Sequence, residues 1–88
     1  MIRRRVIVHG FVQGVFFRDT LRRQAASLGV SGWARNTRDG TVEAVFEGEP
    51  DAVERMVALS RDGPRGARVD RLESVEEQPE GLTDFSIR

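Results

Sequence analysis

The sequence predicts an α+β fold in which two helices cover one face of a mainly antiparallel sheet, in the order β-α-β-β-α-β with a further strand possible at the end. Three observations carry this prediction. The chain begins with a short run rich in β-branched residues, two later segments have apolar residues at helical spacing, and Asp39-Gly40 separates two further short segments. These patterns are typical of a strand, of amphipathic helices and of a hairpin.

The first strand and the first helix are joined by a short loop. Residues Arg4 to Phe11 contain the β-branched run Val6-Ile7-Val8 and form a segment too short for a helix, which predicts a central strand. The loop follows at 12–18. Residues 19–29 are expected to form a helix, because one helical stripe is apolar: Leu21, Ala25 and Leu28.

A β-hairpin is predicted at the middle of the chain. Segments 32–38 and 41–47 flank Asp39-Gly40, and both residues of this pair tolerate the positive φ that a tight hairpin turn requires. In the second strand, Val42, Ala44 and Phe46 alternate with Thr41, Glu43 and Glu47. This alternation predicts one buried face and one mostly wet face.

The second half repeats the pattern of helix and strand. Pro50 suits a first helical turn, and apolar residues at helical spacing extend the predicted helix to Arg61. Residues 68–77 are expected to form a strand with a bulge, because three apolar residues do not share one parity: Val69, Leu72 and Val75. A short strand at 84–88 would close the chain. The predicted architecture is the ferredoxin-like sandwich, formed by residues 1–88 as a single domain.

Composition excludes several classes of site. The chain of 88 residues has no cysteine, so it has no disulfide, no thiolate nucleophile and no cysteine-ligated metal. No stretch is apolar enough for a signal peptide or a membrane span, and we expect a soluble, cytoplasmic monomer. No metal site is visible either, since the acidic run 73–80 lacks the spacing of a calcium loop and is most simply a wet surface.

The charges are sorted along the chain although the net charge is zero. Residues 1–40 carry eight Arg against two Asp, while 41–88 carry six Arg against twelve acids. Nucleic-acid-binding domains are more often net basic, so no nucleic-acid partner is expected. The basic half is the place to look for an anion site.

The loop between the first strand and the first helix is the first candidate site. Residues 10–18 read Gly-Phe-Val-Gln-Gly-Val-Phe-Phe-Arg. A loop that leads into a helix N-terminus can aim several backbone N–H groups at one anion, and Gly14 permits a sharp turn. A fixed cation such as Arg18 near the positive end of a helix is unfavourable unless an anion lies between them. The alternative is that the glycines only make turns and that Arg18 points into solvent.

The second candidate is Asn36, near the end of a predicted strand. Asn is depleted in strands, so its amide could hold a water molecule or a ligand, or it could bond its own backbone beside the turn. By pattern alone the backbone bond is the better interpretation. Trp33 is expected to be a packing residue, and Arg35 and Arg38 are expected to be solvated.

Taken together, the two segments resemble the two signature motifs of the acylphosphatase family. The first motif is Gly10-x-Val12-Gln13-Gly14-Val15-x-Phe17-Arg18, and the second is Gly32-Trp33-Ala34-Arg35-Asn36-x-x-x-Gly40-x-Val42 with Gly48 beyond it. Two long motifs at the right separation are far more specific than a lone glycine pattern. The rest of the chain, from residue 60 onward, matches in length and element order only.

The resemblance implies an enzyme that hydrolyses small acyl phosphates without a metal or cofactor. It implies that Arg18 and the amides of the preceding loop bind the substrate phosphate, that inorganic phosphate or sulfate binds there as a product-like ligand, and that Asn36 orients the attacking water. The loop residues concerned are Gln13, Gly14, Val15, Phe16 and Phe17.

Acyl phosphates suit this set of residues. Their leaving group is a carboxylate, whose conjugate acid has a pKa near about 4, so departure needs little help from a general acid. The transition state spreads negative charge over the phosphoryl oxygens, which an arginine fork and N–H donors stabilise. Two other hypotheses stay open: a ferredoxin-like module that binds RNA or a phosphorylated metabolite without turnover, and a regulatory domain of larger carbamoyl-transfer proteins.

The remaining charged residues have simpler explanations. His9 is expected to be a partly buried structural histidine rather than a general base or a phosphohistidine. Asp19 is expected to cap the first helix rather than to act as a nucleophile. The run Arg3-Arg4-Arg5 is interpreted as edge protection at a strand entrance rather than as an anion patch.

Overall fold

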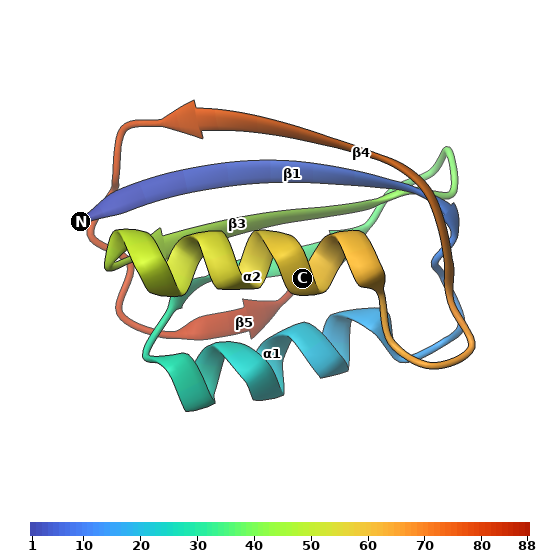
Figure 1. Ribbon diagram of the computed structural model, residues 1–88, viewed down its shortest axis with the longest axis horizontal. Coiled ribbons are helices and arrows are strands. Elements are labelled where there is room, and N and C mark those ends of the chain that lie inside the picture. Colours follow the sequence, from blue (N-terminus) through green and yellow to red (C-terminus); the bar gives the residue numbers. More distant parts are fainter.

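The computed structural model describes residues 1–88, which form five strands and two helices (Figure 1). In chain order the elements are β1 (Ile2–Phe11), α1 (Phe17–Leu28), β2 (Ser31–Asn36), β3 (Val42–Gly48), α2 (Pro50–Asp62), β4 (Arg68–Glu77) and β5 (Phe85–Ile87). Every element predicted from the sequence is present. The predicted bounds are shifted by one to two residues at most ends, and those of β4 are matched at both ends.

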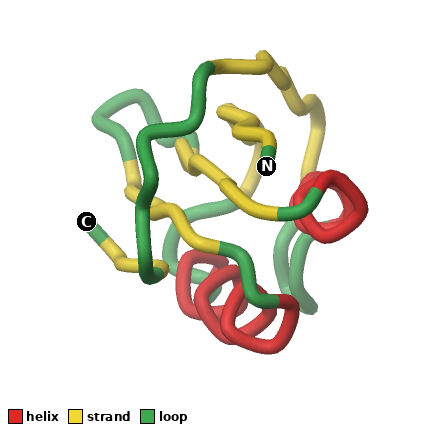
Figure 2. The backbone as a smooth tube through the Cα atoms, turned by 90° about the vertical axis from the view of Figure 1, so that its left-hand side faces the viewer, coloured by secondary structure: helices red, strands yellow, loops and turns green.

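The strands form one sheet in the order β4-β1-β3-β2-β5. All neighbours are antiparallel except β2 and β5, which are parallel. Both helices lie on the same face of this sheet (Figure 2). The α+β, ferredoxin-like prediction is therefore confirmed, and the last strand is a true fifth member of the sheet.

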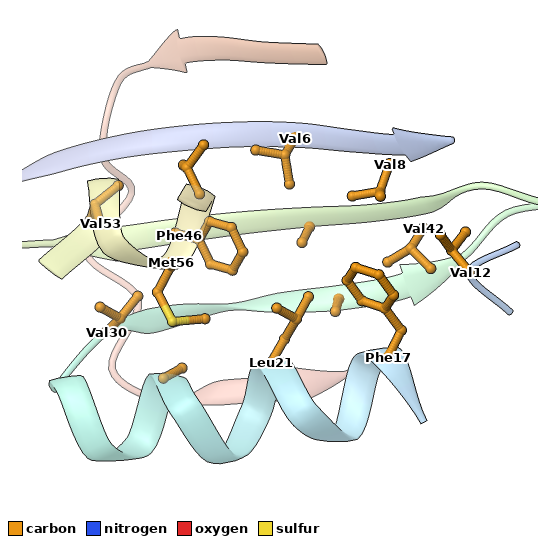
Figure 3. Packing of buried hydrophobic residues seen from close by; sticks show 14 residues of the cluster. Val6, Val8, Val12, Phe17, Leu21, Val30, Val42, Phe46, Val53 and Met56 are labelled. Carbon is orange, nitrogen blue, oxygen red and sulfur yellow. The ribbon is translucent and has the colours of Figure 1, made fainter. Parts of the chain in front are cut away.

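The hydrophobic core lies between the helices and the sheet (Figure 3). Alternate residues of the strands point to the same face, so Val6 and Val8 of β1 meet the buried sides of α1 and α2. Fourteen buried apolar residues form a continuous cluster. Val12 and Phe17 lie at the end of this cluster where α1 begins.

Helix α1 begins two residues earlier than the apolar pattern predicts. Its N-cap is Phe16, whose backbone is left-handed with φ 59° and whose side chain makes no capping bond. The expectation that Asp19 caps this helix is wrong. Asp19 lies in the first turn and pairs with Arg22 at 2.7 Å and Arg23 at 3.2 Å. Its negative charge is still favourably placed near the helix N-terminus.

The bulge expected in β4 is confirmed. Gly10 is paired with Val69 and His9 with Arg71, so Asp70 is an extra residue on β4. The extra residue shifts the alternation of side chains between the two faces of the sheet. Val69 and Leu72 therefore both pack on the core, while Val75 is exposed. Gly10 is required at this point, because a Cβ there would lie 2.1 Å from the backbone oxygen of Arg68.

The sheet face away from the helices is not the wet surface that the alternation predicts. Glu43 is 8% exposed and Glu47 only 3%. The interpretation of the arginine run as edge protection is also wrong, because β1 lies inside the sheet between β4 and β3. Arg3 is buried and donates to Glu47 at 2.6 Å and to Glu77 at 2.9 Å. These charges are buried as pairs, as burial of charge requires.

A second group of paired charges surrounds Trp33 on the same face. Glu43 accepts hydrogen bonds from Arg5 and from Arg35, the latter at 2.6 Å. Arg35 and Arg38 are both exposed as predicted, and Arg35 is also paired with Glu43. The guanidinium groups of Arg5 and Arg88 lie 5.5 and 4.6 Å from the Trp33 ring centroid. Trp33 is buried, so its predicted role as a packing residue is confirmed.

Glu47 also holds the segment that returns from β4 to β5, which runs down the N-terminal end of the sheet in Figure 1. Its carboxylate accepts backbone N–H bonds from Glu80, Gly81 and Leu82 at 2.9, 3.1 and 3.1 Å. Burial by itself raises the pKa of Glu47, but the N–H donors and Arg3 outweigh it and the pKa is lowered. The charged carboxylate is thus the form that the fold stabilises.

We expect Glu47→Gln to destabilise the protein in a pH-dependent way. The substitution leaves Arg3 with one buried partner fewer, so the free energy of unfolding should fall by about 3 kcal/mol at pH 7. Because the folded pKa of Glu47 is lowered, its contribution is present above the unfolded pKa and is lost as pH falls through the folded value. The difference between variant and parent should therefore narrow towards pH 3.

Urea unfolding from pH 7 to pH 3 measures this difference. Glu54→Gln is the matched control, since Glu54 pairs with Arg4 on the surface and should cost less than about 1 kcal/mol. Glu47→Gln could instead lower the free energy of unfolding by the same amount at pH 7 and pH 3. That result would show that the shape of the Glu47 side chain, and not its charge, holds the segment between β4 and β5.

Candidate functional site

One cavity brings together the two predicted motifs. It has a volume of about 300 Å³ and lies at the right-hand end of the molecule in Figure 1, where α1 begins and β2 ends. Arg18 comes from the first turn of α1, Asn36 from the last residue of β2 and Ile87 from β5. The loop before α1 and the side chain of Asp19 complete the lining.

The loop is held at both ends by buried side chains. Val12 is 1% exposed and Phe17 2% exposed, and both are part of the core cluster (Figure 3). The stretch between them, residues 13–16, is thus a short arch with fixed ends. Such an arch fixes the position of its backbone and of Arg18, the residue that follows the second anchor.

The backbone N–H groups of the arch have no acceptor within the protein. Gly14 has φ 76° and Phe16 φ 59°, two left-handed residues within one turn. None of the backbone N–H groups from Gln13 to Asp19 donates a hydrogen bond within the protein, and the first helical bond is Thr20 N to Phe16 O at 3.0 Å. Successive free N–H groups beside a helix N-terminus form an anion-binding site.

Arg18 pairs with no acidic side chain. Its one hydrogen bond is a long one, from Nη1 to the backbone oxygen of Arg88 at 3.4 Å. Many other arginines of this protein are paired with carboxylates, and Asp19 next to it pairs with Arg22 and Arg23 instead. A cation near the positive end of a helix that has no counter-ion favours the binding of an anionic ligand between the two.

Asn36 faces the same cavity because of strand alternation. Gly32, Ala34 and Asn36 point to the helix side of β2, while Trp33 and Arg35 point to the other face. The side chain of Asn36 makes no hydrogen bond within the protein, so the backbone bond considered from the pattern is not formed. Its amide is free to bind a ligand or a water molecule.

The turn between β2 and β3 is held by other residues. Asp39 accepts hydrogen bonds from the Thr37 hydroxyl, from the Thr41 hydroxyl at 2.9 Å and from the Thr41 backbone N–H at 3.2 Å. These bonds, that from Thr37 first, hold the pKa of Asp39 below its usual value. Asn36 is therefore not needed to stabilise the turn.

Gln13 connects the arch to this turn. Its Nε2 donates to the backbone oxygen of Thr37 at 2.8 Å and to that of Thr41 at 2.9 Å. Sequence reasoning gave Gln13 only a backbone role in anion binding and missed this side-chain role. The sequence held no local signal for it, because the two acceptors lie 24 and 28 residues further along the chain.

Of the other candidates only Asp19 lines the cavity, and it pairs with Arg22 and Arg23. His9 is half-buried on β1 and its Nε2 lies 2.6 Å from Glu73, which agrees with a structural role. Ile87 is a cavity residue that the sequence did not single out, because three residues of strand give no usable pattern. No cluster of three or more potential metal ligands occurs among residues 1–88. Neither α1 nor α2 has the length and hydrophobicity of a membrane-spanning helix.

Comparisons with known proteins agree with the two motifs. The family model for acylphosphatase matches residues 4–87. An acylphosphatase from Rubrobacter xylanophilus is 56% identical over 86 residues, which cover 96% of this chain and 77% of that protein. One from Thermococcus kodakarensis is 49% identical over 86 residues, covering 98% of this chain and 94% of that protein.

The fold is similar to that of solved acylphosphatases as well. The crystal structure of the enzyme from Bacillus subtilis superimposes with a TM-score of 0.96 at 35% sequence identity. The match covers 100% of this chain and 99% of that one. The likeness therefore extends through residues 60–88, where the sequence carries no motif.

Proposed function

Because the chain belongs to the acylphosphatase family, we propose that the arch, Arg18 and Asn36 form the active site of an enzyme that hydrolyses small acyl phosphates. The reaction adds water to the carboxyl–phosphate bond and gives a carboxylate and inorganic phosphate. One observation supports the site above all. Free N–H groups, an arginine that pairs with no acidic side chain and an unbonded asparagine all meet at one cavity.

In this proposal the phosphoryl group lies in the arch. The amides of Gln13, Gly14, Val15, Phe16 and Phe17 surround its oxygens, and Arg18 adds a two-pronged, charge-assisted contact. Phosphoryl transfer passes through a loose transition state with negative charge on these oxygens, so fixed donors stabilise it without reorganisation. The buried anchors at Val12 and Phe17 provide that fixed position.

Asn36 then orients the attacking water. An amide cannot remove a proton at neutral pH, but it can hold a water molecule in line with the leaving oxygen. The proton of the water passes to a phosphate oxygen of the substrate itself. The carboxylate leaves without a general acid because its conjugate acid has a pKa near about 4.

One assay tests the function directly. Purified protein is mixed with benzoyl phosphate in the presence of EDTA, and released phosphate is measured. We expect turnover without added metal, and much slower turnover of an alkyl phosphomonoester, whose alkoxide is a poor leaving group. Activity that EDTA abolished and magnesium restored would contradict the proposed metal-free site.

The same assay separates the enzyme from a binding module. A module for a phosphorylated metabolite would bind phosphate without turnover. An RNA-binding module is disfavoured because the aromatic residue of β2, Trp33, is buried beneath two arginines and offers no ring for base stacking. We propose that the protein acts on a small acyl phosphate, as a monomer and in the cytoplasm.

Inorganic phosphate should raise the melting temperature, because a ligand that binds only the folded state stabilises it by mass action. At ten times its dissociation constant the gain is about 1.4 kcal/mol, or roughly 5 to 10 °C for a domain of this size. Differential scanning fluorimetry with phosphate, and with sodium chloride at equal ionic strength, measures the effect. An equal shift with sodium chloride would show general screening and not a bound anion.

A further inference from the structure

Phe16 is an unusual residue for its position. It is the only non-glycine residue with a positive φ, and its side chain is 80% exposed. A left-handed backbone costs a bulky residue of order 1 kcal/mol, and an exposed aromatic ring returns nothing to stability. Neither the core nor the capping of α1 accounts for the ring, since Phe17 fills the core and Phe16 makes no side-chain cap.

The ring stands between two cavities. Phe16 and Asp19 line both the cavity of the proposed active site and a second, more open one of about 620 Å³. The second cavity is lined further by Val15, Thr20, Arg23, Pro64 and Arg65. It thus continues the proposed active site towards the loop that links α2 to β4. Val15 and Phe16 belong both to the arch and to this lining, so the second cavity adjoins the place proposed for the phosphate.

We propose that the acyl group of the substrate lies against the ring of Phe16 and extends into the second cavity, so that Phe16 determines specificity for acyl phosphates with an apolar or aromatic body. This inference rests on the proposed function. The exposed ring, Val15 and Pro64 offer an apolar surface, which gains when an apolar group covers it. An acetyl group is too small to cover this surface.

Arg65 allows the direction of the acyl group to be tested. It is exposed, takes part in no ion pair and lines the second cavity but not the first. Arg23 on the same cavity already pairs with Asp19. A carboxylate at the far end of an acyl group that enters this cavity therefore meets an uncompensated positive charge. An acyl group that leaves the site in another direction does not.

The first experiment compares benzoyl and acetyl phosphate as substrates of Phe16→Ala. The substitution keeps the backbone amide and removes the ring. We expect the ratio of kcat/KM for benzoyl phosphate to that for acetyl phosphate to fall about tenfold. Competition by inorganic phosphate reports whether the arch is intact. Phe11→Ala is the matched control, since Phe11 is an exposed phenylalanine that lines neither cavity, and its ratio should equal that of the parent.

The second experiment uses 4-carboxybenzoyl phosphate beside benzoyl phosphate. We expect Arg65→Ala to lower the ratio of kcat/KM for the carboxylated substrate to that for benzoyl phosphate by about threefold to tenfold. Arg61→Ala is the control, because Arg61 is an exposed arginine on α2 that lines neither cavity. An unchanged ratio in Arg65→Ala would overturn the direction proposed for the acyl group.

The outcomes also separate this inference from the proposed function. If the parent protein hydrolyses neither acetyl nor benzoyl phosphate, the proposed function is wrong. If the parent hydrolyses both, and Phe16→Ala changes the two kcat/KM values by the same factor, the function stands and the role of Phe16 in specificity is wrong.

Discussion

Arg18→Ala should lose at least about 10²-fold in kcat and should also bind inorganic phosphate more weakly. The guanidinium is expected to contact phosphate oxygens both in the bound substrate and in the transition state, where their negative charge is redistributed. Loss of one preorganised donor to such a group typically costs two to three orders of magnitude. Steady-state kinetics with benzoyl phosphate and the competitive inhibition constant of phosphate measure the two effects.

Arg18→Lys should fail as well, because an ammonium group cannot reproduce the two-pronged geometry of a guanidinium. Arg38→Ala is the matched control. Arg38 is an exposed arginine on the adjacent turn, it does not line the cavity, and its removal lowers the positive charge of this end equally. A similar loss in both alanine variants would indicate long-range attraction of the substrate, and near-normal kcat/KM in Arg18→Ala would remove Arg18 from the mechanism.

Asn36→Ala should lower kcat by roughly 10²-fold or more and leave phosphate affinity nearly unchanged. If Asn36 positions the attacking water, its contribution is made in the transition state and not in the binding of phosphate. The melting temperature should also change little, because the Asn36 side chain makes no hydrogen bond within the protein and the adjacent turn is held by Asp39. The contrast with Arg18→Ala, which weakens binding too, separates the two roles.

Kinetics, phosphate affinity and melting temperature should be measured on one preparation. Gln24→Ala removes an exposed amide from α1 and serves as the control for loss of a side-chain amide. A structural role would instead lower stability by about 1 kcal/mol and leave turnover per folded molecule unchanged. Unchanged kcat in Asn36→Ala would therefore leave a phosphate-binding site without its proposed water-positioning group.

The fold could be predicted because local patterns agree with the tertiary structure. Leu21, Ala25 and the apolar residues of α2 repeat at helical spacing, and Asp39-Gly40 marks the hairpin that joins β2 and β3. Even the irregular parity of β4 was informative, since Val69 and Leu72 share the core only through a bulge at Asp70. Such patterns depend only on residues that are close in sequence, so they can be recognised without knowledge of the tertiary structure.

The buried charges could not be predicted for the opposite reason. Glu47 reads as a solvent-facing residue of an alternating strand, but its partners lie 44 residues earlier at Arg3 and more than 30 residues later in the return segment. The same holds for the start of α1, where a left-handed Phe16 replaces the polar cap that propensity favours. At Glu47, tertiary contacts outweighed local preference.

The candidate site was predicted mainly from the two motifs, and less from the physical properties of its single residues. Position and alternation alone left Arg18 and Asn36 open to ordinary structural explanations, and the resemblance to a family decided between them. The structure adds what spacing cannot give: that both residues line one cavity and that neither is engaged by a close partner in the protein. The side-chain role of Gln13 needed coordinates, because its acceptors belong to a turn 24 and 28 residues away.

The two hydrogen bonds of Gln13 also limit how the length of this chain can vary. Its Nε2 reaches the carbonyls at both ends of the turn, so an inserted or deleted residue between Thr37 and Thr41 would pull one acceptor out of range. The linker at 63–67 has no comparable connection to the arch. Loops of this protein should therefore differ in their tolerance to insertions: the β2–β3 turn is confined to its present length, whereas the α2–β4 linker can grow.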